Sequence, residues 1–196
     1  MLKRAKNLAD SVNRSKEIHI VTHIDADGIT AGAIASQTLK RMGKQHSIEF
    51  VKQLDKMVLE RLKNENHELV WFTDLGSSIS VNSPDINKII TDHHACPDDS
   101  DLNFHLNPHL FGLDGSFQIS GAGATYFVSK SIDQKNMDLA SLAIVGACGD
   151  LQDRKHCRLA GVNRRILEDG EKAGVVQYKT DIRYFGRETR PIYKLL

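Results

Sequence analysis

Ile18–Gly28, which reads Ile-His-Ile-Val-Thr-His-Ile-Asp-Ala-Asp-Gly, is the stretch that decides the predicted fold. Its apolar run ends in His23, Asp25 and Asp27, which stand at alternate positions. In an extended backbone alternate side chains point to the same side, so we expect these three to converge at the end of a buried strand. Carboxylates and imidazoles gathered there are costly to bury unless a cation lies between them. The stretch therefore predicts a divalent metal site.

The bulk composition is that of one ordinary globular domain. The chain has 196 residues, of which 40% are hydrophobic and 26% charged, as in typical soluble domains. Lys and Arg number 26 against 25 Asp and Glu, for a formal net charge of +1. No general positive field attracts nucleic acid, so such a partner must be held by a local patch.

The cysteines and the N-terminus predict a cytoplasmic location. Three cysteines without paired spacing indicate a reducing compartment and no disulfide framework. The first residues, Met-Leu-Lys-Arg-Ala-Lys, are followed by polar residues, unlike a signal peptide. No run approaches the roughly 20 apolar residues that a membrane span needs. We therefore expect no membrane partner.

Apolar periodicity and turn residues predict strands that alternate with helices. Strands are expected over Glu17–Thr22, Ser47–Lys52, Leu69–Thr73 and Lys88–Thr91. Helices are expected over 2–16, Gly28–Met42, Leu54–Lys63, Gly121–Ile132, Met137–Cys148 and Asn163–Lys172, and a loop over 95–119. The alternation predicts an α/β fold, with a mostly parallel sheet covered by helices on both faces. Ligands then bind at the carboxyl ends of the strands.

Acidic and histidine side chains follow three of the predicted strands. These are His23 with Asp25 and Asp27, then Asp74, then Asp92-His93-His94, while Asp150 stands at a helix-to-loop junction. Each alone is also explained as a cap, a turn former or a solvated pair. Together at one sheet edge, however, the carboxylates would repel one another unless cations separated them.

The types and number of these groups indicate which ions they would hold. Mixed imidazole and carboxylate ligands suit manganese, iron or zinc. Five or six groups exceed the needs of one tetrahedral ion and fit two ions about 3.5–4 Å apart that share a carboxylate. That arrangement is typical of phosphoester hydrolysis.

Glycines and basic residues are candidates for substrate binding. Gly121 and Gly123 open a predicted helix whose amides are candidates to hold a phosphate; close packing and turn formation are the alternative explanation, and the more common one for glycines at a helix entry. Arg154 and Arg158 follow Asp150 in a basic stretch that also holds Lys155, Arg164 and Arg165. They are candidates to contact a nucleic-acid backbone, and the alternative is a solvated helix face.

In this order the motifs resemble those of the DHH phosphoesterase superfamily. The matching residues are His23-Ile-Asp25-Ala-Asp27-Gly28 for the first motif, Asp74 for the second, Asp92-His93-His94 for the third and Asp150 for the fourth. Within the superfamily the chain looks most like the archaeal RecJ-like nucleases. The sequence segments that support this resemblance are Thr22–Thr30, Ser120–Ala124, Gly146–Asp150 and Gly186–Pro191.

The resemblance implies two Mn²⁺ ions, with Mg²⁺ as an alternative. Asp25 would bind one ion and Asp27 the other, and Asp74 would bridge them. His93 and Asp150 would complete the shell of the second ion.

The resemblance gives the two remaining histidines different roles. His94 would lie near the scissile phosphate and stabilise its charge. His23 stands two residues before Asp25, whereas many superfamily members place this histidine four residues before, where this chain has Val21. It would therefore either bind the metal or orient Asp25.

The resemblance also implies an activity and a domain plan. The expected function is a manganese-dependent exonuclease on single-stranded DNA or RNA, using a two-metal-activated water. Alternatives are an oligonucleotide or cyclic-dinucleotide phosphodiesterase, or a GINS-binding replication scaffold with secondary nuclease activity. Residues 1–185 would form the catalytic domain and 186–196 the start of an interdomain linker. The second, substrate-binding domain is expected to be missing, which favours a truncated chain over a naturally short one.

Overall fold

A five-stranded parallel sheet forms the centre of the molecule in the computed structural model, which describes residues 1–78, 85–96, 103–155, 157–179 and 189–194. The strands lie in the order β2-β1-β3-β4-β5. Their bounds are β1 Glu17–His23, β2 Gln45–Val51, β3 Val70–Thr73, β4 Lys88–Thr91 and β5 His105–Leu106. After β1 the chain adds β2 on one side of this strand and then crosses over to add β3 on its other side. Such a switch in strand order is where open α/β sheets bind ligands.

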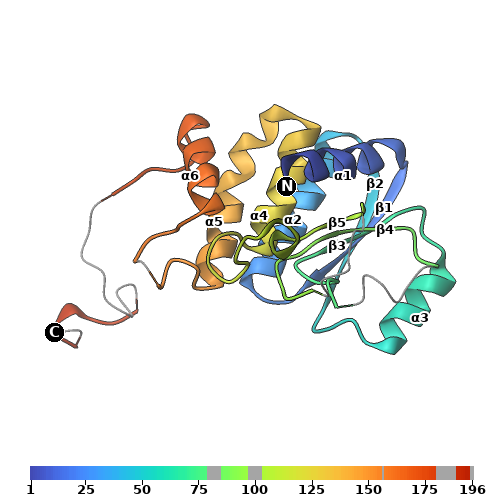
Figure 1. The fold of residues 1–196 in the computed structure, drawn as a ribbon, viewed down its shortest axis with the longest axis horizontal. Coiled ribbons are helices and arrows are strands. Elements are labelled where there is room, and N and C mark those ends of the chain that lie inside the picture. The colour runs from blue at the N-terminus through green and yellow to red at the C-terminus, as the bar shows by residue number, and fades with distance from the viewer. Residues whose placement is uncertain (79–84, 97–102, 156, 180–188, 195–196) are drawn as a thin grey trace.

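Helices cover both faces of this sheet, as the sequence predicts (Figure 1). The α-helices are α1 Leu2–Arg14, α2 Ala26–Arg41, α3 Lys56–Glu65, α4 Gly121–Ile132, α5 Ala140–Gly149 and α6 Val162–Lys172. Shorter 3₁₀ helices are η1 Pro108–Phe111, η2 Gln134–Leu139 and η3 Ile192–Lys194. Helices α1, α2 and α4 pack on one face of the sheet, and α3 packs on the opposite face. Helix α5 packs against α2 and α4, and α6 packs against α5. The predicted α/β fold is confirmed.

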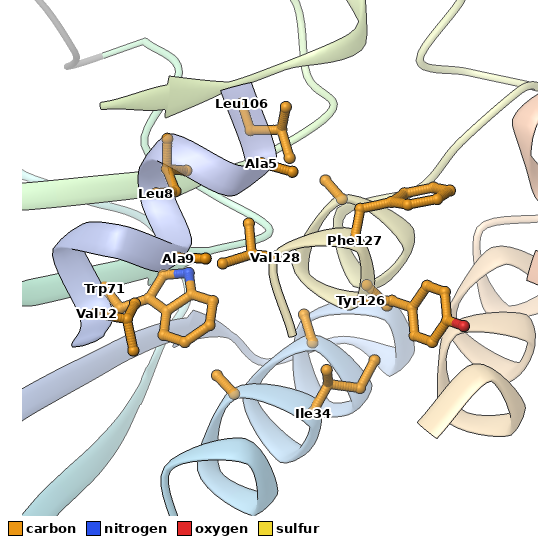
Figure 2. Close-up of a cluster of buried hydrophobic side chains, with 14 of the residues drawn as sticks. Ala5, Leu8, Ala9, Val12, Ile34, Trp71, Leu106, Tyr126, Phe127 and Val128 are labelled. Atoms are coloured by element: carbon orange, nitrogen blue, oxygen red, sulfur yellow. The ribbon is translucent and has the colours of Figure 1, made fainter. Parts of the chain in front are cut away.

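The larger core lies between the sheet and helices α1, α2 and α4. One apolar face of α1 is fully buried there, because its small and branched side chains recur at helical spacing. Figure 2 shows this face next to Trp71 of β3 and Val128 of α4. The Trp71 indole is fully buried and donates to Thr91 Oγ1 at 3.1 Å, so its polar atom is satisfied inside the core.

Two sequence predictions are wrong in the second half of the chain. The segment 95–119, predicted as a loop, contains β5 and η1. Strand β5 has two residues, too few to show a period of two, and exists because His105 pairs with Ile90 of β4. The helix predicted over Met137–Cys148 begins only at Ala140, since η2 occupies the preceding turn.

The domain boundary predicted at residue 185 lies outside the described residues, so it stays a prediction. No helix within the described part of the chain has the length and apolar character needed to cross a membrane.

A buried histidine gives the fold a pH dependence that is testable. His105 is fully buried with its Nε2 3.0 Å from Ser77 Oγ, and burial lowers its pKa from 6.5 to about 4. Above pH 6.5 the ring is neutral in both states. As pH falls, the unfolded chain takes the proton first, so stability drops by up to about 3 kcal/mol by pH 4.

We expect His105→Gln to flatten the stability profile between pH 6.5 and pH 4. Urea unfolding of both proteins at several pH values measures this, because the other titrating groups are common to both. Parallel profiles would show that His105 is not the group responsible.

Candidate metal centre

Six of the predicted residues converge at the carboxyl ends of β1, β3 and β4. They form two groups whose ligand atoms lie within 4.8 Å of one another, namely His23, Asp25 and Asp74, and Asp27, His93 and Asp150. A third such group joins Asp74 and His93 to His94. The tertiary structure thus brings residues from distant parts of the chain to one sheet edge. Their role as metal ligands stays a prediction.

The first motif reaches this point by a different backbone path from the one predicted. The strand ends at His23, and helix α2 begins at Ala26 with Asp25 as its N-cap. An Asp25 carboxylate oxygen accepts from Gly28 N at 2.9 Å, which satisfies a free amide of the first turn. Asp27 lies within the helix. Alternation along an extended strand is therefore the wrong explanation for the convergence of Asp25 and Asp27.

Asp27 is a fully buried carboxylate held by a second helix. Its Oδ2 accepts from Gly121 N at 2.7 Å and its Oδ1 from Ala122 N at 3.1 Å. These are amides of the first turn of α4, which carries a partial positive charge. Helix α4 therefore fixes the orientation of the Asp27 carboxylate.

The space around these carboxylates requires glycine. A Cβ on Gly146 would lie 2.3 Å from Asp27 Oδ1, and one on Gly121 would lie 2.4 Å from Asp74 Oδ1. The predicted phosphate contact at Gly121 and Gly123 stays a prediction, and the amides of both glycines already have partners within the protein. The Gly121 amide donates a hydrogen bond to Asp27, and the Gly123 amide donates one to Ser120 Oγ at 3.2 Å. Both glycines are buried. Close packing, the alternative explanation, accounts for both.

Asp74 carries the electrostatic evidence that the site fits a divalent cation. It follows β3 in the left-handed region, at φ 58°, and is 1% exposed. Its Oδ1 is buried and receives no hydrogen bond of good geometry. Burial, together with repulsion from Asp27 and Asp92, raises the pKa of Asp74 to about 10, although the nearby His93 acts to lower it. A divalent cation between these carboxylates would compensate their charge.

His93 presents one ring nitrogen to three carboxylates. Its Nδ1 donates to the Gly115 carbonyl at 2.7 Å, so the lone pair of the neutral ring is on Nε2. This atom lies 3.0 Å from Asp150 Oδ2, 3.3 Å from Asp74 Oδ1 and 3.7 Å from Asp27 Oδ2. Burial lowers the pKa of His93, but its interactions with Asp150 and Asp74 outweigh this and raise it to about 12. Gly115 was not among the predicted site residues, although Asp114-Gly115 is a recognisable turn signal.

Asp92 lies outside the three groups and orients the loop that carries His94. Its Oδ1 accepts from the amide of His93 at 2.7 Å and lies 2.7 Å from His94 Nδ1, while its Oδ2 accepts from Ser77 N at 2.9 Å. Burial tends to raise the pKa of Asp92, but the hydrogen bond from His94 and the other donors hold it below its usual range. Asp92 stays ionised and fixes the ring of His94.

A groove of about 210 Å³ opens beside the centre. His94, Asp74 and Lys52, which comes just after β2, are among the residues that line it. The groove therefore carries a basic side chain as well as the carboxylates. The predicted substrate residues Arg154 and Arg158 are exposed and do not line this groove. Their predicted contact with a nucleic-acid backbone stays untested.

The packing around Asp27 makes Gly146 a sensitive position. We expect Gly146→Ala to lower the free energy of unfolding by about 1–3 kcal/mol, because the new methyl group must displace the Asp27 carboxylate. It should also weaken divalent metal binding. Val145→Ala, an exposed neighbour on α5, serves as the control and should change stability by less than about 0.5 kcal/mol. Urea unfolding and metal titration measure both effects; equal results for the two variants would contradict this account of Gly146.

Comparison with known proteins gives relatives of this fold and sequence. An uncharacterized protein of Methanocaldococcus jannaschii is 36% identical over 182 residues, an alignment that covers 88% of this chain and 41% of that protein. The chain thus spans about two fifths of the length of this relative. The crystal structure of an exonuclease RecJ bound to manganese has a TM-score of 0.68 at 22% identity, covering 86% of this chain and 46% of that one.

A second solved structure has the same fold. RecJ from Thermus thermophilus in complex with Mn²⁺ has a TM-score of 0.65 at 23% identity, covering 86% of this chain and 26% of that one. The family model "DHH family, N-terminal domain" matches residues 17–147, which include β1 to β5 and most of the predicted ligands. On this match, the chain belongs to the DHH family.

Proposed function

We propose that this chain is a manganese-dependent phosphodiesterase, and more narrowly a RecJ-like exonuclease on single-stranded DNA or RNA. The observation that carries the proposal is the pair of ligand groups at the switch point of the sheet, His23-Asp25-Asp74 and Asp27-His93-Asp150. The two groups adjoin, because Asp74 Oδ1 of the first lies 3.3 Å from His93 Nε2 of the second. Solved RecJ structures of similar fold contain Mn²⁺ or Mg²⁺, which supports a divalent cation here. The choice of Mn²⁺ rests on the histidines among the ligands, since mixed imidazole and carboxylate sites suit manganese better than magnesium.

Each group would hold one ion. His23 Nδ1 lies 2.9 Å from Asp25 Oδ2 and 3.9 Å from Asp74 Oδ2 and has no hydrogen-bond partner of good geometry, so we assign it as a ligand of the first ion. Asp74 would bridge the two. When bound, two such ions would supply an activated water and would neutralise charge on the phosphate.

The protein groups around the ions have roles of their own in this proposal. The Gly115 carbonyl keeps the Nε2 lone pair of His93 directed at the centre. Asp92 accepts from Nδ1 of His94, which leaves Nε2 available to a phosphate oxygen in the groove. The hydrogen bond to Asp92 also raises the pKa of His94, so its positive form persists near developing negative charge. Lys52 would contact the adjoining phosphate of a chain-like substrate.

The deciding experiment is a time course on end-labelled single-stranded DNA and RNA with Mn²⁺, Mg²⁺ or a chelator. We expect Mn²⁺-dependent shortening from one end, and a loss of at least about 100-fold in Asp74→Asn. Cleavage restricted to oligonucleotides of a few residues or to cyclic dinucleotides would favour the small-substrate alternative. Metal binding without hydrolysis of any of these would overturn the proposal. Retained GINS binding by Asp74→Asn, with cleavage lost, would support the replication role beside the nuclease.

A substitution at His94 separates the effect on the rate of hydrolysis from the effect on metal binding. We expect His94→Gln to lower kcat by about 10²–10³-fold, the usual cost of losing one group that stabilises transition-state charge. The Mn²⁺ dissociation constant should change little, because Asp25, Asp27, Asp74 and His93 are intact. Single-turnover hydrolysis and calorimetric Mn²⁺ titration measure the two quantities. A parallel loss of metal binding would instead make His94 a ligand.

A further inference from the structure

A second group of imidazole and carboxylate side chains lies away from the candidate metal centre. His19 of β1, Glu65 at the end of α3 and His67 in the following turn each place a ligand atom within 4.8 Å of the others. His19 precedes His23 by four residues on the same strand, so the Cα atoms of these two histidines lie roughly 13 Å apart. The proposed nuclease function does not use any of these three residues.

His19 supplies a buried nitrogen without a hydrogen bond. The residue is 7% exposed, and its Nδ1 lies 2.7 Å from Ser47 Oγ of β2, which fixes the ring. Its Nε2 is buried and makes no hydrogen bond, and Glu49 Oε2 lies 3.6 Å away. An unsatisfied buried polar atom destabilises the folded protein. Coordination to a cation would use this lone pair.

His67 and Glu65 approach the His19 ring from the end of α3 and the residues that follow it. The rings of His19 and His67 are stacked with centroids 4.2 Å apart and planes 6° apart, and His67 Nε2 lies 2.9 Å from Glu65 Oε2. Tetrahedral zinc with bonds of about 2.0–2.1 Å needs ligand atoms roughly 3.3 Å apart. Binding of one ion would therefore require rotation about the side-chain torsions, which are broad for the outer bond of His and Glu, to bring the three ligand atoms together and to turn the two stacked rings apart.

The charge of the cluster also suits a cation. Arg61 pairs with both Glu49 and Glu65, and so cancels one of their two negative charges. One negative charge remains when both imidazoles are neutral.

We propose that His19, Glu65 and His67 form a separate transition-metal site, best suited to Zn²⁺, that fastens the end of α3 to β1. Two imidazoles and one carboxylate form a ligand set typical of zinc and other borderline metals. Helix α3 has one buried residue, Leu62, and its end is exposed. A metal ion bound between this helix end and β1 would therefore hold α3 against the sheet more firmly than its few buried side chains do.

The test compares zinc binding by the wild-type chain, His67→Ala and His46→Ala. His46 is a partly buried histidine of β2 outside the cluster, bonded to Ser36 Oγ at 2.9 Å, and is the matched control. We expect His67→Ala to bind one zinc equivalent fewer per chain, to lose part of the visible spectrum of the Co²⁺-loaded protein, and to show a smaller rise in Tm with ZnCl₂. His46→Ala should match the wild type in all three.

Equal zinc content, Co²⁺ spectra and Tm shifts in all three proteins would overturn the proposal. Glu65→Gln, a change at an exposed helix end, gives a second test should His67→Ala not fold: it should raise the zinc dissociation constant of this site at least about tenfold, and an unchanged constant would equally overturn the proposal. Mn²⁺-dependent hydrolysis should persist in both variants, and its absence from every protein tested would count against the proposed nuclease function alone.

Discussion

The burial of the Asp27 carboxylate is the constraint on which the arrangement of this molecule depends. A fully buried carboxylate is costly: burial raises the pKa of Asp27, and two amides from the start of α4 together with His93 offset only part of that cost. These contacts set the position of α4 relative to α2. They also require a glycine at position 146 of α5. One carboxylate thus determines how three helices meet at the edge of the sheet.

The same electrostatic need explains why the neighbouring carboxylates differ in character. Asp92 is buried but surrounded by donors, so its pKa is low and it positions His94. Asp74 is buried beside other carboxylates, and its pKa is high. The donors around Asp92 stabilise its negative charge without a metal. The negative charge of Asp74 is balanced only by a proton or a cation, which is why Asp74 is central to the proposed two-ion centre.

Much of the fold was predictable because its signals are local. The apolar runs before Asp74 and Asp92 predicted β3 and β4 correctly, and the helical spacing of α1 and α4 gave their extents within two residues. Strand β5 was not predictable, since two residues carry no period and the strand depends on pairing with β4. The start of α2 was misplaced because the capping role of Asp25 competed with the strand pattern.

The sequence by itself determined the identity of the candidate ligands, since carboxylates and histidines that follow apolar strands are visible in the linear order. Only the tertiary structure decided how they are grouped. Asp25 and Asp27 are two residues apart yet belong to different groups, because one caps α2 and the other points from its first turn toward α4. The cluster of His19, Glu65 and His67 was likewise absent from the sequence pattern. Its members come together only when α3 packs against β1, and proximity between distant segments is a property of packing rather than of local sequence.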